Sequence, residues 1–250
     1  MGEHDPTEYG THIAADYDEI YGAAFDTDGA VACLAELAAD GPILELGVGT
    51  GRLALPLAAR GLTVHGVDSS AEMLELLHAK PGGEAVTTTL ADFCDVRVGD
   101  PGRFSLVVLA VNTMYALGSQ AEQVQCFETA AWHLAPGGCF VVEAWVPEPI
   151  PPGVSLQPRL LSPGYVGLVV ADHDPARQIL STQQIVFGGE AKVRVFPVVH
   201  RYAWPSELDV MARMNALHLE RRWQDWSRTP YGPLSRNHVS VYRASPDGDT

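Results

Sequence analysis

The sequence predicts an α/β protein with a doubly wound, mostly parallel sheet of seven strands, helices on both faces, and an antiparallel β insertion after the fifth strand. Two observations carry this prediction. Short apolar runs alternate with segments of helical periodicity over residues 31–145, which is typical of βαβ units and a parallel sheet. From residue 146 the pattern changes to alternating strand-like segments separated by turns, which is typical of an antiparallel meander.

The elements of the first part follow one another at short intervals. Ser69 and Ser70 are expected to cap the third helix, and Glu72 stands at the capping-box spacing from Ser69. Pro56 lies inside the second helix as a candidate kink. We expect helices over 31–40, 52–61, 71–80 and 122–134, and strands over 42–47, 62–68, 85–92, 104–112 and 139–145.

The second part begins with a proline-rich segment, residues 146–158, which is expected to be irregular. Strand-like segments follow, Pro205 and Ser206 open another helix, and two last strands are expected to return to the larger sheet. These elements are expected over 165–174, 177–187, 192–204, 206–217, 219–226 and 237–244. The chain therefore divides into a core (1–146), an insertion (147–204) and a closing part of the core (205–250).

Composition restricts the partners. The formal net charge is −15 with a pI near 4.8, which argues against nucleic acid or an anionic membrane as partner, because phosphate contacts need clustered Lys and Arg. Cys33, Cys94, Cys126 and Cys139 show no C-x-x-C pairing, so we expect buried thiols and neither a metal site nor disulfides. The N-terminus is polar and acidic, and no apolar run approaches membrane-spanning length, so we expect a soluble, cytoplasmic protein.

The stretch "ILELGVGTG" (43–51) is a strand that runs into a glycine turn. A dinucleotide fingerprint would need glycine where Arg52 stands, and no lysine follows as in a nucleotide triphosphate loop. Glu45 would repel a pyrophosphate but would hydrogen-bond a cationic ligand. Gly47, Gly49 and Gly51 let such a ligand approach the backbone closely.

Two further acids follow the next strands. Asp68 ends the second strand and is placed to accept a bidentate bond from a ribose diol. Asp92, after the third strand, is placed to accept from an exocyclic amine such as that of adenine. Three strand ends with Glu, Asp and Asp around a glycine turn predict a site for a nucleoside without phosphate.

The set "ELGVGTGRL", "GVDSS", "LADF" and "HLAPGGCFVVE" resembles the class I S-adenosylmethionine-dependent methyltransferases, with motifs spanning roughly 9–145. The resemblance implies a Rossmann-like fold and S-adenosylmethionine as cofactor, with S-adenosylhomocysteine as product. It also implies a role for each motif residue. Glu45, Gly47, Gly49 and Gly51 would line the methionine, Asp68 would hold the ribose, Ser69 and Met73 would pack beside the adenosine, Asp92 and Phe93 would meet adenine, and Asn112 would lie beside the transferred methyl.

An N-terminal helix covers the cofactor in many such enzymes, so the resemblance implies a lid that contains Tyr17 and Tyr21. Four residues apart, these tyrosines share one helical face, and an aromatic ring favours a sulfonium cation. Ordinary packing of an amphipathic helix is the alternative.

Methyl transfer from a sulfonium is an in-line displacement, so the protein chiefly aligns the nucleophile and removes water. A general base is needed only where the nucleophile carries a proton that it does not lose spontaneously. The candidates near the expected methyl position are Tyr115, on the loop after Asn112, and Glu143, which ends the fifth strand and either orients the acceptor or is a solvated acid.

The segments "YDEIY" and "VVEAWVPEP" and the insertion resemble macrolide deoxysugar N,N-dimethyltransferases, in which the insertion roofs the acceptor pocket and contributes to dimerisation. This implies a homodimer. It also makes His200, Arg236 and His238 candidates for acceptor contacts, with either histidine a general base or a structural residue. The loop at Tyr115 lacks the histidine expected of those enzymes, which argues against a sugar acceptor.

The leading hypothesis is transfer of a methyl group to an O or N atom of a small, natural-product-like molecule. The alternative is an S-adenosylmethionine-binding protein that catalyses a rearrangement or cyclisation, or only binds its ligand. An NAD-linked oxidoreductase is disfavoured by Arg52.

Overall fold

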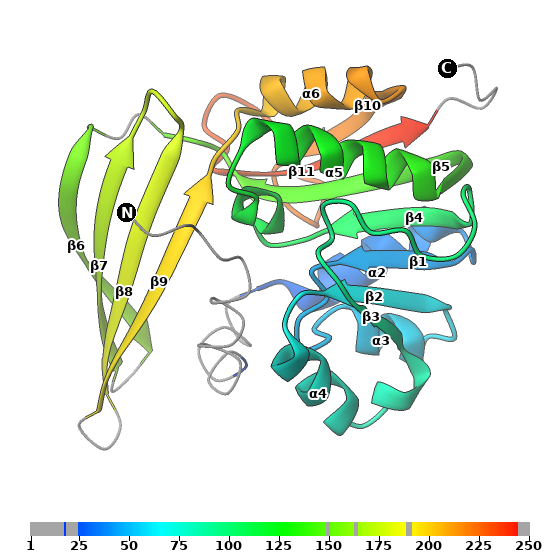
Figure 1. The fold of residues 1–250 in the computed structure, drawn as a ribbon, viewed down its shortest axis with the longest axis horizontal. Coiled ribbons are helices and arrows are strands. Elements are labelled where there is room, and N and C mark those ends of the chain that lie inside the picture. Colours follow the sequence, from blue (N-terminus) through cyan, green and yellow to red (C-terminus); the bar gives the residue numbers. More distant parts are fainter. Residues whose placement is uncertain (1–17, 19–24, 149–150, 163–164, 189–191, 245–250) are drawn as a thin grey trace.

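The computed structural model describes residue 18 and residues 25–148, 151–162, 165–188 and 192–244, which form two sheets and the helices that cover the larger one (Figure 1). The larger sheet has seven strands in the order β10-β11-β5-β4-β1-β2-β3. The smaller sheet has four, in the order β6-β7-β8-β9. The strands of the larger sheet are β1 (Ile43–Leu46), β2 (Val64–Asp68), β3 (Thr87–Leu90), β4 (Phe104–Leu109), β5 (Leu134–Trp145), β10 (Leu217–Trp223) and β11 (Asn237–Ala244).

The larger sheet is the predicted doubly wound one. Strands β1 to β5 are parallel, and β11 is antiparallel to both β5 and β10. The strand order reverses between β1 and β4, which is where open α/β sheets form a ligand crevice at the carboxyl ends of the strands. Those ends point toward the smaller sheet (Figure 1).

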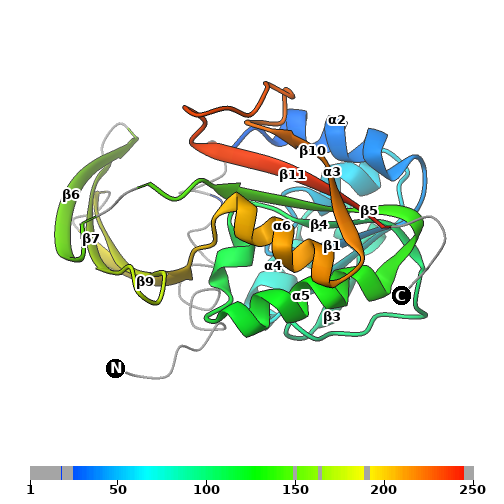
Figure 2. The same cartoon turned by 90° about the horizontal axis from the view of Figure 1, so that it is seen from above.

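Helices cover both faces, because parallel strands are apolar on both sides. Figure 2 shows α2 (Thr27–Ala38) and α3 (Ala54–Ala59) on one side of the sheet and α5 (Gln120–His133) and α6 (Pro205–Met214) on the other. The apolar side chains form two clusters accordingly. One packs α5 and α6 against the sheet, and the other packs α2, α3 and α4 (Ala71–Ala79) against it.

Helix caps partly follow the prediction. The N-cap of α4 is Ser70, whose Oγ accepts a hydrogen bond from the Met73 amide at 3.2 Å, so the predicted capping box from Ser69 is wrong. The chain has a capping box at the start of α5 instead, where the side chains of Ser119 and Glu122 bond reciprocally to each other's backbone amides.

The smaller sheet is a meander of β6 (Gly153–Ser162), β7 (Tyr165–Asp174), β8 (Ile179–Gly188) and β9 (Lys192–Arg201), antiparallel throughout. The prediction that 146–158 is irregular is wrong from Gly153 onward, where β6 begins. Strand β6 forms one edge of the smaller sheet. An edge strand has one side without a partner strand, so it tolerates Pro158, which has no N–H. The chain then returns to the larger sheet through α6, β10 and β11, as predicted.

Strand β4 ends earlier than predicted, at Leu109, because Val111 and Asn112 adopt the left-handed conformation with φ of 47° and 63°. The four cysteines are buried free thiols, as the sequence predicts. Within the described part of the chain, no helix is long and apolar enough to cross a membrane.

Candidate functional site

The glycine turn between β1 and α3 combines packing with an open surface. Gly47, Gly49 and Gly51 all have positive φ, between 53° and 85°. A Cβ on Gly47 would lie 2.5 Å from Thr113 Cγ2, and one on Gly51 would lie 2.9 Å from the Leu55 and Leu77 side chains. A Cβ on Gly49 would meet no atom within 4 Å. The outer glycines are therefore required by packing, while Gly49 presents its backbone to open space.

Asp68 fixes the shape of this turn from the end of β2. Its Oδ2 accepts a hydrogen bond from the Gly49 amide at 2.8 Å, and its Oδ1 accepts one from the Ser70 amide at 2.9 Å. Burial raises the pKa of Asp68, although these amide hydrogen bonds oppose the shift. Each carboxylate oxygen has a second lone pair, so the group retains the capacity to accept hydroxyl donors.

Glu45 is a buried carboxyl on β1, 4% exposed, whose Oε2 has no hydrogen-bond partner among the described residues. Burial raises the pKa of Glu45 to about 8, with Arg52 lowering it and Asp68 raising it further. Buried polar atoms in proteins are almost always paired, so this oxygen is a candidate acceptor for a ligand donor. A cationic or N–H group in the turn would satisfy it.

The residues expected beside the adenosine lie at two strand ends. Ser69 is half-buried and Met73 is buried at the start of α4, next to Asp68. Asp92 is exposed after β3, and its Oδ1 accepts a hydrogen bond from the Cys94 amide at 2.8 Å. Phe93 is 9% exposed and packs in the apolar cluster under α5.

The left-handed turn at Val111 and Asn112 is fastened to β5. The Val111 amide donates to Glu143 Oε2 at 2.9 Å, and the Asn112 amide donates to the Glu143 carbonyl at 3.0 Å. The Asn112 Oδ1 accepts from the Trp145 amide at 2.8 Å. The turn therefore depends on β5 for its conformation and lies against the glycine turn through Thr113.

Two of the predicted catalytic side chains are engaged inside the protein. Glu143 Oε1 accepts a hydrogen bond from Trp226 Nε1 at 2.7 Å, so both oxygens of this carboxylate serve internal donors. Tyr115 is fully buried, with its hydroxyl 3.0 Å from the Trp145 carbonyl and 2.8 Å from the Ala203 carbonyl. Burial also raises the pKa of Tyr115, so the phenol stays neutral. Both side chains are therefore hydrogen-bonded within the protein, and their roles at an acceptor stay predictions.

The predicted histidines differ in their surroundings. His238 is fully buried on β11, with Nδ1 2.9 Å from Ser240 Oγ and no partner for Nε2 among the described residues. Burial, helped by the charge of Arg222, lowers the pKa of His238 to about 3, which does not suit a general base. His200 is half-buried on β9 with its ring centroid 6.5 Å from that of Trp145.

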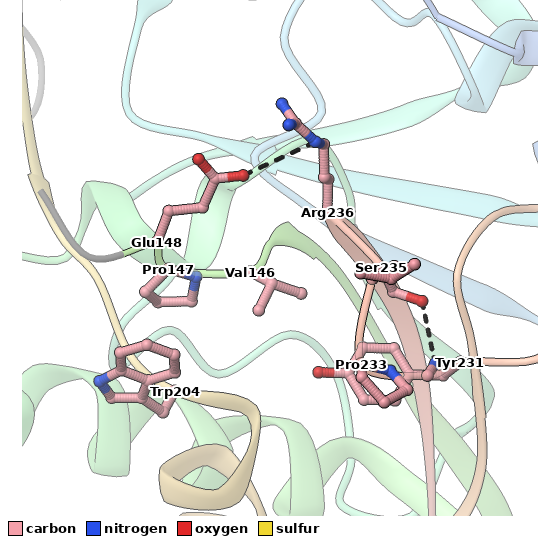
Figure 3. Close-up of a pocket in the computed structure, with 10 residues that line it drawn as sticks. Val146, Pro147, Glu148, Trp204, Tyr231, Pro233, Ser235 and Arg236 are labelled. Atoms are coloured by element: carbon pink, nitrogen blue, oxygen red, sulfur yellow. Dashed lines mark hydrogen bonds and ion pairs between the residues drawn. The ribbon is translucent and has the colours of Figure 1, made fainter.

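A hollow of about 750 Å³ opens beyond the end of β5 (Figure 3). Its rim carries an ion pair, in which Arg236 Nε lies 3.7 Å from Glu148 Oε1, and both side chains are largely exposed. Trp204 is 43% exposed at the opposite wall. The hollow is lined by Val146, Pro147, Glu148, Trp204, Tyr231, Gly232, Pro233, Leu234, Ser235 and Arg236.

Comparison with known proteins identifies the family. Residues 43–138 match the family model for a methyltransferase domain. The structure of the CcbJ methyltransferase from Streptomyces caelestis is 42% identical, covers 96% of this chain and 99% of its own, and superposes with a TM-score of 0.90. The chain belongs to the class I S-adenosylmethionine-dependent methyltransferases.

More distant relatives of this methyltransferase agree. The cypemycin N-terminal methyltransferase from a Streptomyces species is 27% identical over 203 residues, which are 80% of this chain and 81% of the relative. The S-adenosylmethionine-bound structure of CalS10, an amino pentose methyltransferase from Micromonospora echinaspora, shares the fold with a TM-score of 0.67. It is 22% identical and covers 90% of this chain and 97% of its own.

The methyltransferase site fits its cofactor on three observations. Among the described residues, Glu45 has a buried oxygen without a partner that would accept from the ammonium of the methionine part. Gly49 leaves room at the backbone, and Asp68 retains acceptor capacity for the ribose. Tyr17 and Tyr21 lie outside the described residues, so the predicted lid over this site stays a prediction.

Sequence reasoning missed three features of the methyltransferase site. Trp226 ends the expected strand 219–226 and belongs to no motif, and Glu148 lies in the segment "VVEAWVPEP" but was given no role there. Lys80 was also missed. Its Nζ lies 2.5 Å from Asp18 Oδ2 and donates to the Thr50 carbonyl at 2.9 Å, which ties the glycine turn to residue 18.

Proposed function

We propose that this methyltransferase transfers the methyl group of S-adenosylmethionine to an O or N atom of a small, natural-product-like molecule bound in the hollow beside β5. The observation that carries this proposal is the hollow itself. Its volume of about 750 Å³ falls within the range of about 300–1,000 Å³ found for small-molecule sites. Its walls are mostly apolar and aromatic, which suits an acceptor with an apolar body and few polar groups.

The position of the hollow supports the same proposal. The amide of Val146, in its wall, donates to the Arg236 carbonyl at 2.7 Å, and the preceding residue, Trp145, bonds to Asn112 on the cofactor side. An acceptor in the hollow would thus lie beside Val146, the residue that follows the end of β5, and Trp145 at that end holds the Asn112 turn. The cypemycin enzyme is named for methylation at an N-terminus, which favours nitrogen as one acceptor atom.

We assign the following tasks to the residues of this chain. S-adenosylmethionine, when bound, supplies an electrophilic methyl group, so the protein aligns the acceptor and excludes water. Glu45 would hold the ammonium of the cofactor, Asp68 its ribose, and Asn112 would border the methyl. The other proposed cofactor contacts are Gly47, Gly49, Gly51, Ser69, Met73, Asp92 and Phe93, with Tyr17 and Tyr21 as the proposed lid.

On the acceptor side, Arg236 is proposed to contact the acceptor from the rim, where its side chain is 82% exposed. His200 is the remaining proposed general base. It lies opposite Leu180 in the register of β8 and β9, and Leu180 packs against the core under α5 and α6. Residues 147–204 would act as one unit that roofs the hollow, with 1–146 and 205–250 as the core.

We further propose a cytoplasmic homodimer that binds neither nucleic acid nor membrane. The net charge of −15 supports the second part, because such a surface repels phosphate. An apolar row on the smaller sheet supports the first. Val166 stands opposite Phe187, and Phe187 stands opposite Val193, with these side chains between 41% and 57% exposed. Contiguous exposed apolar surface of this kind marks interaction sites.

The test of the proposed function is an acceptor screen with methyl-deuterated S-adenosylmethionine. Purified protein is incubated with a panel of small amines, alcohols and phenols that carry apolar rings, and products are detected by mass spectrometry. We expect a labelled product together with S-adenosylhomocysteine. Label that enters only RNA or protein, or cofactor bound without any methylated product, would overturn the proposal; the second result would favour the rearrangement or binding alternative.

A further inference from the structure

The loop between β10 and β11, residues 224–236, contributes both to the hollow and to the cofactor side of the sheet. Residues 231–236 line the hollow, and Trp226, on the same loop, is buried against Glu143. We infer that the Glu143 carboxylate is a positioning group that couples this loop to the cofactor-binding turn. The acceptor side of this inference rests on the proposed function.

The central contact is one carboxylate shared by two donors from distant parts of the chain. Oε1 accepts the Trp226 indole N–H at 2.7 Å, and Oε2 accepts the Val111 amide at 2.9 Å. Because both donors bind the same carboxyl group, a shift of one donor is transmitted to the other. Trp226 is 5% exposed, so water does not readily replace its bond.

Val111 needs this support. It is β-branched and has a φ of 47°, a conformation that such residues rarely adopt. Strained backbone persists where surrounding contacts hold it, and it clusters at functional sites. The Glu143 side chain holds the Val111 amide, and the Glu143 carbonyl holds the next amide, that of Asn112. Loss of the side-chain contact would let the turn relax toward an extended conformation.

The left-handed turn at Val111 and Asn112 also contacts the glycine turn, through Thr113. Thr113 follows it, with its hydroxyl donating to the Ala110 carbonyl at 2.6 Å. Its Cγ2 occupies the space where a Cβ of Gly47 would stand, at 2.5 Å. A shift of the turn therefore moves Thr113 against or away from Gly47, the first glycine of the cofactor turn.

Hydrogen bonds within the loop between β10 and β11 hold residues 224–236 together. The Gln224 amide donates to the Thr229 carbonyl at 2.8 Å, and the Ser235 hydroxyl donates to Gln224 Oε1 at 3.0 Å. Arg228 pairs with Glu36 on α2. Because the two ends of the loop are bonded to each other, a ligand that pushes on the hollow wall also displaces Trp226.

The chain of contacts predicts coupling between the two ligand sites. A conformation of the loop that seats Trp226 on Glu143 favours the strained turn, and that turn favours the cofactor. Coupling is reciprocal, so cofactor binding would also order the wall of the hollow.

The experiment compares Trp226→Phe with Trp223→Phe. The first removes the indole donor and keeps the aromatic bulk, while Trp223, which also packs against the α2–α4 cluster, has no bond to Glu143. Binding of S-adenosylhomocysteine is measured by calorimetry, and hydrogen exchange is measured on a peptide spanning 110–116 in the free protein. Trp226→Phe should weaken binding about five- to tenfold and speed exchange at Val111 and Asn112. Trp223→Phe should change neither.

A double-mutant cycle completes the test. An amide at position 143 keeps only one acceptor oxygen for two donors, so Glu143→Gln should itself loosen the turn. Adding Trp226→Phe to Glu143→Gln should then cost little more affinity. Equal effects of the two tryptophan variants, or additive losses in the double mutant, would overturn the inference. Neither readout needs an acceptor, so failure of the acceptor screen with an intact cycle would affect the proposed function alone.

Discussion

The Asp68 carboxylate and the Gly49 amide, nineteen residues apart, meet at 2.8 Å and join the end of β2 to the middle of the glycine turn. The acid expected to hold the ribose also determines the shape of the surface that the ligand meets. The proposed ribose contact and the geometry of the turn would therefore depend on one side chain.

Asp68→Ala should reduce affinity for S-adenosylhomocysteine by about 100-fold or more, because it removes the acceptor for two amides as well as the ribose contact. Calorimetry measures the change. Asp95→Ala, which removes an exposed acid, is the control and should leave affinity unchanged. Affinity of the Asp68 variant within twofold of the parent would refute the assigned role.

Cofactor binding should release a proton from Glu45. Burial, opposed by Arg52, raises the pKa of this carboxyl to about 8, so the free protein carries it protonated at pH 7. The ammonium of the ligand favours the ionised form. Affinity should therefore strengthen as pH rises toward 8, by up to about tenfold per pH unit, and level off above it. Calorimetry in two buffers of different ionisation heat counts the proton.

Glu45→Gln is the matched variant for that measurement. It should bind more weakly and show neither proton release nor the pH dependence. The free energy of unfolding of the free protein should depend on pH in the opposite direction to the affinity. The contribution of Glu45 to this stability is greatest below its ordinary pKa of 4.5 and is lost as pH rises through 8. Equal proton release by parent and variant would contradict the assignment to Glu45.

Lys80→Met should weaken cofactor binding only about twofold, because its ion pair with Asp18 is partly exposed. Burial raises the pKa of Asp18, but hydrogen bonds from Lys80 and Thr50 outweigh it and hold the pKa below its ordinary value. The loss should be larger at low salt than at high salt, measured as the dissociation constant of S-adenosylhomocysteine. A salt-independent loss would mean that the Thr50 contact alone matters.

Arg201→Gln should lower the free energy of unfolding by about 3 kcal/mol, because it leaves Glu207 without its buried cation. Arg201 is 6% exposed, 2.7 Å from Glu207 Oε1 and 2.6 Å from Gln123 Oε1. Urea denaturation measures the change. Arg243→Gln, which breaks the more exposed pair with Glu220, should cost under about 1 kcal/mol. Similar losses in both would show that burial does not set the difference.

Phe187→Glu should shift the protein to monomer in light scattering after size exclusion, because it places a charge in the apolar row of the smaller sheet. Leu90→Glu, at an exposed position on the edge strand of the larger sheet, should not. A parent protein that is already monomeric at micromolar concentration would contradict the proposed homodimer.

The sequence predicted the larger sheet well because most of its parallel strands are short apolar runs, and β3 is a β-branched run, separated by segments of helical periodicity. Strand β11 was predicted with its correct bounds, and β1 and β2 within a few residues. The proline-rich start of the insertion misled, because the rule against proline in strands does not hold at an edge, and whether a strand is an edge depends on tertiary structure.

The site residues likewise fall into two groups, those in local motifs and those placed by contacts between distant parts of the chain. Glu45, Asp68 and the glycines belong to local motifs, so their juxtaposition follows from strand order. The role of Glu143 depends on Trp226, 83 residues away, on a loop with no motif. Tyr115 was a candidate near the expected methyl position, and its hydroxyl donates to the Ala203 carbonyl, 88 residues later. Contacts over such separations are decided by packing between elements, which periodicity does not report.

Both edges of the smaller sheet carry a proline within the strand, Pro158 in β6 and Pro197 in β9. An open sheet edge is a template on which further strands can add, and a mid-strand proline interrupts that template. The two prolines would therefore oppose strand addition at either edge, although one face of the sheet carries exposed apolar side chains. The apolar face, not the edges, is then the part of this sheet that suits contact with another surface.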